Sequence, residues 1–150
     1  MSQFQFKAAV AERGDEVRKT VYSFGEVEEE VWTLTRWLRA RKYVLEDTVK
    51  MIEEATECHK SPRENDYYAD PTVALGCEVS LYFAQYPQLY TGKAKNGAPI
   101  FISKPGILNV DAVECITTLD GILKFHWFVE MHDFGSLLRR EKESNPDFKL

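Results

Sequence analysis

Hydrophobic residues recur at helical spacing in the first half of the chain. Residues 31–41 predict an amphipathic helix whose apolar face consists of Val31, Leu34, Trp37 and Leu38. The acidic run "EVEEEVW" at 26–32 suits the start of that helix, because the positive end of a helix dipole stabilises carboxylates. A second helix is predicted over about 46–59, with a stripe made of Leu45, Val49, Ile52, Thr56 and His59. Residues 1–30 are otherwise charged and only weakly periodic.

The stretch "KSPRENDYYADP" at 60–71 interrupts this pattern with two prolines and several turn-forming residues. We predict a loop here, together with the main internal boundary of the chain. The expected domains are a helical module over residues 1–65 and a second domain over residues 66–150.

The second half of the chain mixes helical and strand patterns. Residues 72–86 predict a helix that ends at Pro87. A strand pair is predicted near 89–104, because Asn96-Gly97 supplies turn residues that tolerate positive φ. A short helix is expected at 110–116, after Asn109 or Asp111. The predicted fold class is therefore mixed α/β and rich in helix.

A long helix is predicted from about 118 to 143. Its main stripe consists of Leu119, Ile122, Leu123, Val129, Phe134 and Leu137. Trp127, Phe128 and Met131 add apolar surface on other sides. A helix that is apolar almost all round is usually buried, so we expect this one to be covered on more than one face.

Composition narrows the class of protein. Hydrophobic residues make up 44% of the chain and charged residues 29%, which is typical of a soluble globular protein. The sequence contains no apolar run long enough for a bilayer span and no secretory signal pattern. Three widely spaced cysteines, Cys58, Cys77 and Cys115, argue against a disulfide framework or a zinc site and favour a reducing, cytoplasmic compartment.

A basic cluster stands out in a chain whose net charge is −5: Arg36, Arg39, Arg41 and Lys42. Helical spacing places Arg41 on the apolar side of its predicted helix, seven residues after Leu34. A buried arginine requires either an acidic partner or an anionic ligand such as a phosphate. Two interpretations stay open: a salt bridge from Arg41 with the other cations solvated, or a site for an anion. Nucleic-acid binding is disfavoured by the net acidity and the absence of a known motif.

His126 and Glu130 lie one helical turn apart on the predicted Leu119/Ile122 face. They are either a mutually hydrogen-bonded core pair or residues that line a pocket. No spacing of histidine, cysteine or acidic residues matches a metal site, and no catalytic motif is present in the sequence. We therefore expect neither a metal nor an enzymatic activity.

Three stretches follow one another along the chain: "TLTRWLRARKY" at 33–43, "YPQLYTGKAKNGAPIFISKPG" at 86–106, and "LKFHWFVEM" at 123–131. In this order and spacing they resemble the motifs of the CRAL-TRIO lipid-binding family. The first resembles the signature of its N-terminal helical module. The other two resemble the entry into its lipid-binding domain and the long helix that follows. The resemblance covers about residues 30–142 and is strongest to the phosphatidylinositol/phosphatidylcholine transfer branch.

This resemblance implies a helical bundle and an α/β domain that encloses one phospholipid, without enzymatic activity or a cofactor besides the bound lipid. Arg41 and Lys42 match an Arg-Lys pair close to the inositol phosphate, so a phosphoinositide is favoured. Tyr90 matches a strand tyrosine near the phosphatidylcholine head group. Phe101 stands where a second such tyrosine is common, and it lacks the hydroxyl. Family members act in the cytoplasm and contact membrane surfaces transiently.

The chain also departs from the family pattern. His59 stands where a tryptophan is usual, and Val44 replaces an aspartate that caps the second helix. The family's lipid-binding domain continues well beyond a point like Leu150, so residues 66–150 are expected to form only part of it. An alternative function follows from this: an interaction or adaptor module, able to self-associate, that lacks a closed lipid pocket.

Overall fold

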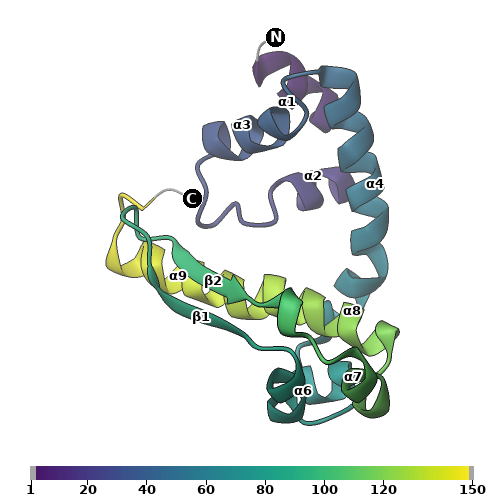
Figure 1. Cartoon of the computed structure of the whole chain (residues 1–150). Coiled ribbons are helices and arrows are strands. Elements are labelled where there is room, and N and C mark those ends of the chain that lie inside the picture. Colours follow the sequence, from purple (N-terminus) through teal and green to yellow (C-terminus); the bar gives the residue numbers. More distant parts are fainter. Residues whose placement is uncertain (1–2, 149–150) are drawn as a thin grey trace. The chain divides into compact units, whose positions relative to one another are not determined.

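The computed structural model describes residues 3–148, and the chain divides into two compact units (Figure 1). Of the described residues, unit 1 comprises 3–61 together with 147–148, and unit 2 comprises 62–146. The division after Ser61 falls inside a continuous helix, whereas the sequence predicted a loop at this point.

Unit 1 is built from α1 (Gln3–Ala11), α2 (Asp15–Val21), α3 (Glu30–Ala40) and most of α4 (Leu45–Glu64). Its core consists of Phe6, Val10, Val17, Val21, Leu34, Leu38 and Ile52. The sequence did not reveal α1 or α2, because each contributes only two buried apolar side chains, one helical turn apart. The predicted face of α3 is confirmed for Leu34 and Leu38. It is wrong for Val31, which is 56% exposed, since Thr33 takes the buried position instead.

The chain reverses between α3 and α4 without a glycine. The backbone N–H of Tyr43 donates to the Leu38 carbonyl over 2.8 Å, and that of Lys42 donates to the Arg39 carbonyl over 3.1 Å. This is the Schellman pattern of hydrogen bonds, which usually places glycine at its left-handed position. Here Lys42 and Tyr43 adopt φ angles of 51° and 63°. Side chains in this conformation cost the fold about 1–3 kcal/mol each.

Helix α4 continues through Pro62 to Glu64, so the predicted loop over 60–71 is wrong in its first part. Proline removes one hydrogen bond from a helix, but Pro62 lies near the helix end and is buried, so its packing compensates for the loss. The chain then turns through η1 (Asp66–Tyr68), whose three residues all have positive φ.

Unit 2 begins with two short helices where the sequence predicted one over 72–86. These are α5 (Pro71–Leu75) and α6 (Val79–Gln85). Asp70 caps α5 by accepting hydrogen bonds from the N–H groups of Thr72 and Val73. Gly76 ends it with a left-handed φ of 76°. Apolar periodicity continues across this glycine, which explains why the break was missed.

The predicted strand pair is confirmed as β1 (Gln88–Lys93) and β2 (Pro99–Ser103), which form an antiparallel two-stranded sheet. Gly97 occupies the connecting turn with a φ of 89°. In the observed register Tyr90 lies opposite Phe101, and Leu89 lies opposite Ile102. Because side chains alternate along a strand, Tyr90 and Phe101 share one face of the sheet, and Leu89 and Ile102 share the other.

The remaining helices agree with the predicted ranges. A short 3₁₀ turn, η2 (Pro105–Ile107), precedes α7 (Val110–Ile116), whose cap is Asn109. The long helix consists of α8 (Leu119–Phe128), the π-helical segment η3 (Val129–Phe134) and α9 (Gly135–Ser144). Together with the small sheet, these helices confirm a helix-rich, mixed α/β fold.

The buried face of the long helix differs from the predicted stripe. Leu119 and Leu123 are 73% and 55% exposed. Val129 is buried as predicted, and the other buried positions are Gly121 and Phe125, followed by Gly135, Leu138 and Glu141. The segment η3 explains the change of spacing, because a π-helix has more residues per turn than an α-helix and rotates the later positions.

The sheet lies along the long helix (Figure 1) and closes the second core. The buried residues of this second core are Leu75, Tyr82, Val113, Phe125 and Val129. The ammonium of Lys93 on β1 pairs with the nearly buried carboxylate of Glu141 on α9. This ion pair joins the far end of the sheet to the last helix.

Val44 occupies the N-cap of α4, where a side-chain oxygen is preferred and valine offers none. Val44→Asp should raise the free energy of unfolding by about 1 kcal/mol, because the carboxylate would accept an unpaired N–H of the first turn. Urea unfolding followed by circular dichroism measures the change. Val44→Ala removes the same methyl groups without adding an acceptor, so an equal gain from it would contradict the capping explanation.

Gly121 allows α8 to approach the end of α5 closely. A Cβ at this position would lie 2.7 Å from the carbonyl oxygen of Leu75, which also accepts a hydrogen bond from the Thr117 hydroxyl. Gly121→Ala should therefore lower the free energy of unfolding by about 1–3 kcal/mol. Gly106→Ala is the matched control, since a Cβ there meets nothing within 4 Å. Similar urea midpoints for the two variants would show that the close approach is unimportant.

Candidate functional site

A cavity of about 270 Å³ lies between the sheet and α8 in unit 2. Its walls are mostly aromatic and aliphatic, with a few polar groups: Tyr82, Tyr86, Gln88, Phe101, Ser103, Ile122, Leu123, Phe125, His126, Val129 and Glu130. Phe101, His126 and Glu130, three of the residues predicted from the sequence, therefore share one cavity. Apolar cavities with a few polar groups are the usual form of small-molecule sites.

Packing of rings holds the cavity in place. The Tyr82 ring lies 5.5 Å from that of Phe125 in an edge-to-face arrangement, and Tyr82 is fully buried. The hydroxyl groups of Tyr86 and Ser103 hydrogen-bond to each other over 2.9 Å, which ties α6 to β2. Strand alternation then turns Phe101 and Ser103 toward the same cavity.

Tyr90 lies beside this cavity. Its ring centroid is 4.9 Å from that of Phe101 and 6.4 Å from that of Phe134 on η3. Tyr90 also lines a second hollow of about 170 Å³ together with Leu137 and Glu141. The structure thus brings Tyr90 and Phe101 together as an aromatic pair.

Two carboxylates on η3, those of Glu130 and Asp133, contribute to the electrostatic environment of Tyr90. Burial raises the pKa of the Tyr90 hydroxyl, and the charges of Glu130 and Asp133 raise it further. Burial also raises the pKa of Asp133, against a smaller lowering effect of His132. Within residues 3–148 the Tyr90 hydroxyl makes no hydrogen bond, so a neutral donor is available beside these acidic groups.

His126 and Glu130 are not a hydrogen-bonded core pair. His126 is exposed and Glu130 is partly buried, and no hydrogen bond connects them in the described part of the chain. Their polar groups instead contribute to the cavity wall. The interpretation of His126 and Glu130 as a buried pair is wrong, because the face of α8 that carries Leu119 and Leu123 is open to solvent.

Arg41 and Lys42 belong to unit 1, and the prediction that Arg41 lies on the apolar side of its helix is wrong. Helix α3 ends at Ala40, so Arg41 is the C-cap residue and no longer follows helical spacing. Both side chains are exposed. The guanidinium of Arg41 donates to the neighbouring Ala40 carbonyl over 3.1 Å and contacts no carboxylate among residues 3–148.

The buried charge of this region belongs to Glu28, which the sequence analysis did not single out. Its side chain is 1% exposed and accepts two hydrogen bonds of 2.9 Å from Arg36 and one of 3.1 Å from Thr33. Arg36 is thus paired with a buried carboxylate, which neither interpretation of the basic cluster predicts. The available signal was the spacing of Thr33 and Arg36, which places both on one side of α3 next to the acidic run.

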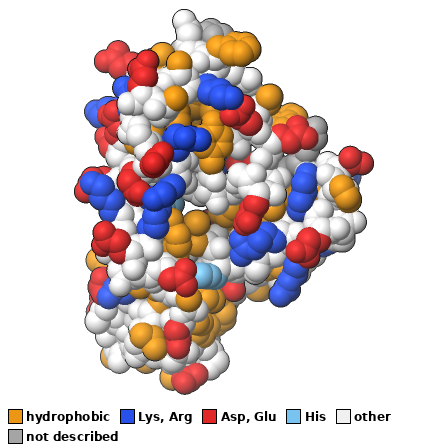
Figure 2. Space-filling model, turned by 180° about the vertical axis from the view of Figure 1, so that it is seen from behind, with side chains coloured by type: hydrophobic (Ala, Val, Ile, Leu, Met, Phe, Trp, Pro, Cys, Tyr) orange, Lys and Arg blue, Asp and Glu red, His pale blue; other side chains and the backbone are white. Residues whose placement is uncertain are grey.

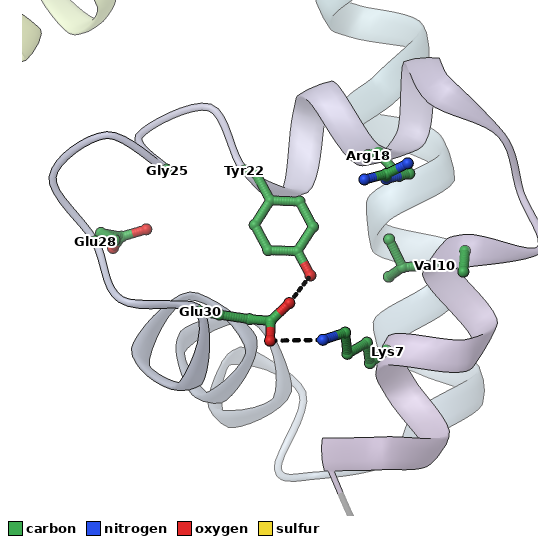
Figure 3. Close-up of a pocket in the computed structure, with 8 residues that line it drawn as sticks. Lys7, Val10, Arg18, Tyr22, Gly25, Glu28 and Glu30 are labelled. Carbon is green, nitrogen blue, oxygen red and sulfur yellow. Dashed lines mark hydrogen bonds and ion pairs between the residues drawn. The ribbon is translucent and has the colours of Figure 1, made fainter.

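Unit 1 has a wider hollow of about 600 Å³, shown in Figure 3. Its charged groups neutralise one another. Glu30 accepts hydrogen bonds from Lys7 over 2.7 Å and from the Tyr22 hydroxyl over 3.2 Å. The hydrogen bond from Lys7 lowers the pKa of Glu30, whereas burial, and after it the neighbouring Glu30, raises the pKa of Tyr22. The hollow therefore offers few unsatisfied groups to a ligand, and the cavity in unit 2 is the better candidate.

No group of three or more histidine, cysteine, aspartate or glutamate side chains among the described residues is arranged to hold a metal ion. None of the helices formed by residues 3–148 has the length and apolar character needed to cross a membrane.

Comparison with known proteins identifies the N-terminal part of the chain. Residues 4–54, which span α1 to the middle of α4, match the family described as "CRAL/TRIO, N-terminal domain". No solved structure gives a significant match to the chain.

Several curated proteins are similar to the chain. It is 32% identical over 94 residues to the phosphatidylinositol/phosphatidylcholine transfer protein SFH9 of Arabidopsis thaliana, over 63% of this chain and 16% of the relative. It is 34% identical over 98 residues to the transfer protein SFH13 of the same plant, over 65% and 15%. It is 32% identical over 96 residues to the SEC14 cytosolic factor of Candida glabrata, over 61% and 30%.

The aligned part of the chain thus spans less than a third of each of these relatives. The family match covers the first of the three motifs found in the sequence, at residues 33–43. The chain therefore contains a match to the CRAL/TRIO N-terminal domain at residues 4–54, and it is similar over 61–65% of its length to these phosphatidylinositol/phosphatidylcholine transfer proteins and SEC14 cytosolic factors.

Proposed function

We propose that this chain is a non-enzymatic module that binds and presents a phospholipid, with phosphatidylinositol or a related lipid as the favoured ligand. The cavity between the sheet and α8 carries the proposal, because its walls are largely apolar and aromatic. An apolar wall replaces the bilayer around acyl chains, and each buried methylene contributes about 0.8 kcal/mol. No cofactor is needed for this activity, which would take place in the cytoplasm at membrane surfaces.

Arg41 and Lys42 are proposed to bind the phosphate of the lipid head group. Both are exposed, and neither contacts a carboxylate in the part of the chain that the structure describes. An arginine fork and a lysine ammonium are suitable donors for a phosphate. The similar protein SFH9 is named a phosphatidylinositol/phosphatidylcholine transfer protein, which supports this choice of ligand.

Within unit 2, Tyr90 and Phe101 are proposed as head-group contacts. Tyr90 supports the idea through its hydroxyl, which has no hydrogen-bond partner in the described residues. The adjacent rings, with Glu130 and Asp133 nearby, would also accept a cationic group such as choline. His126 and Glu130 would line the wall of the cavity between the sheet and α8.

A second candidate is an interaction module, and the exposed apolar side chains of unit 2 favour it. Leu119, Leu123, Ile107 and Val110 are all more than half exposed. Figure 2 shows hydrophobic side chains at the surface of the lower part of the molecule, where Figure 1 places α6 and α7. Exposed apolar patches commonly bind another protein or a second copy.

Light scattering on the purified chain distinguishes the two candidates. A dimer or larger species that dissociates in Leu119→Ser/Leu123→Ser would support the interaction module, since these substitutions remove exposed apolar surface from α8. A monomer whose mass does not change with concentration would leave lipid binding as the function.

The head-group assignment is tested by Arg41→Ala/Lys42→Ala. Uptake of fluorescent phosphatidylinositol should weaken about 100-fold, because two charge-assisted contacts are lost, while uptake of phosphatidylcholine stays within a few-fold. The control is Arg18→Ala/Lys19→Ala, which removes two adjacent exposed cations from α2 in the same unit. Equal losses for the two lipids, or no loss at all, would show that Arg41 and Lys42 do not select the head group.

A further inference from the structure

The turn between α3 and α4 presents cationic and apolar side chains together. We call this the turn surface and define it by Arg39, Arg41, Lys42, Tyr43 and Val44. The three cations are exposed, and the exposed fractions of Tyr43 and Val44 are 48% and 47%. Tyrosine beside arginine and lysine is typical of proteins that meet the interface of a membrane.

The cations of the turn surface differ from most other cations of unit 1. Elsewhere a cationic side chain commonly contacts a glutamate, as in Lys7–Glu30, Arg13–Glu53, Lys19–Glu16, Arg36–Glu28 and Lys60–Glu57. Within the described residues, Arg39, Arg41 and Lys42 have no such partner. Their charge is therefore available to an external anion.

Three neighbouring positions of this turn carry residue types that destabilise it. Lys42 and Tyr43 occupy left-handed conformations that favour glycine or asparagine. Val44 occupies an N-cap, where valine is among the least suitable residues. Strain of this kind persists where the side chains serve another purpose, and here each of the three side chains is exposed.

The helix dipole alone does not explain this composition. It accounts for cations near the end of α3 and for Glu46 and Asp47 in the first turn of α4. It gives no reason for an exposed tyrosine and valine between them. The opposite end of α3 also exposes apolar side chains, Val31 and Trp32, but these follow the acidic run at 26–30.

We propose that the turn surface docks this chain on an anionic lipid bilayer. Tyr43 and Val44 enter the interfacial layer, and Arg39, Arg41 and Lys42 lie against the lipid phosphates. The inference rests on the proposed function only in that a module that binds phospholipid must meet a bilayer to exchange it. It adds the surface through which that contact is made.

The variant Tyr43→Asn/Val44→Ser tests this docking with two substitutions that should not destabilise the fold. Asparagine tolerates positive φ better than tyrosine, and serine caps a helix better than valine, so the variant should unfold at higher urea concentration than the parent. Its affinity for vesicles of phosphatidylcholine with 30% phosphatidylserine should nevertheless fall about tenfold or more in flotation assays. The parent should bind these vesicles more tightly than pure phosphatidylcholine vesicles and should weaken as salt is raised.

Phe4→Ser is the control, because it removes an 83% exposed aromatic side chain from α1 in the same unit and should leave vesicle binding unchanged. Undiminished vesicle binding by Tyr43→Asn/Val44→Ser would overturn the proposal, as would equal binding of the parent to neutral and anionic vesicles. A chain that docks through the turn surface but retains no phospholipid would refute the proposed function alone. Retention of phospholipid without docking would refute this inference alone.

Discussion

The buried carboxylate of Glu28 is the constraint on which unit 1 depends. A carboxylate removed from water must be paired and fully hydrogen-bonded, and Arg36 and Thr33 meet that requirement. The pairing anchors the middle of α3 to the segment that precedes it. It also separates the basic cluster into one structural cation, Arg36, and three cations at the helix end that have no acidic partner among the described residues. The proposed binding of an anion by unit 1 rests on that separation.

In unit 2 the comparable constraint is the change of pitch at η3. The buried face of the long helix runs through Phe125 and Val129 and resumes at Gly135 and Leu138. The π-helical segment between them brings Phe134 against Tyr90 on β1 and places the acidic groups of Glu130 and Asp133 near the same tyrosine. The aromatic and acidic features of the candidate site therefore depend on one local departure from α-helical geometry, of a kind often found at functional sites.

The sequence predicted the elements that rest on local signals. Asn109 predicted the start of α7, Asn96-Gly97 predicted the hairpin turn, and the motif at 33–43 predicted the match to the CRAL/TRIO N-terminal domain. Positions that depend on other parts of the fold were predicted less well. Arg41 was misplaced because spacing does not reveal that α3 stops one residue earlier, and Leu119 and Leu123 were misplaced because the neighbours that bury α8 lie on another side. The domain limits at 65 and 66 and the roles assigned to the six site residues stay predictions.

The central claim, that this chain holds a phospholipid, is tested most directly by native mass spectrometry of the protein purified from cells, with lipid extraction in parallel. The account predicts one phospholipid per chain, with a phosphatidylinositol head group enriched over its share of the cellular lipid. A lipid-free chain that also acquires no lipid from added vesicles would contradict it.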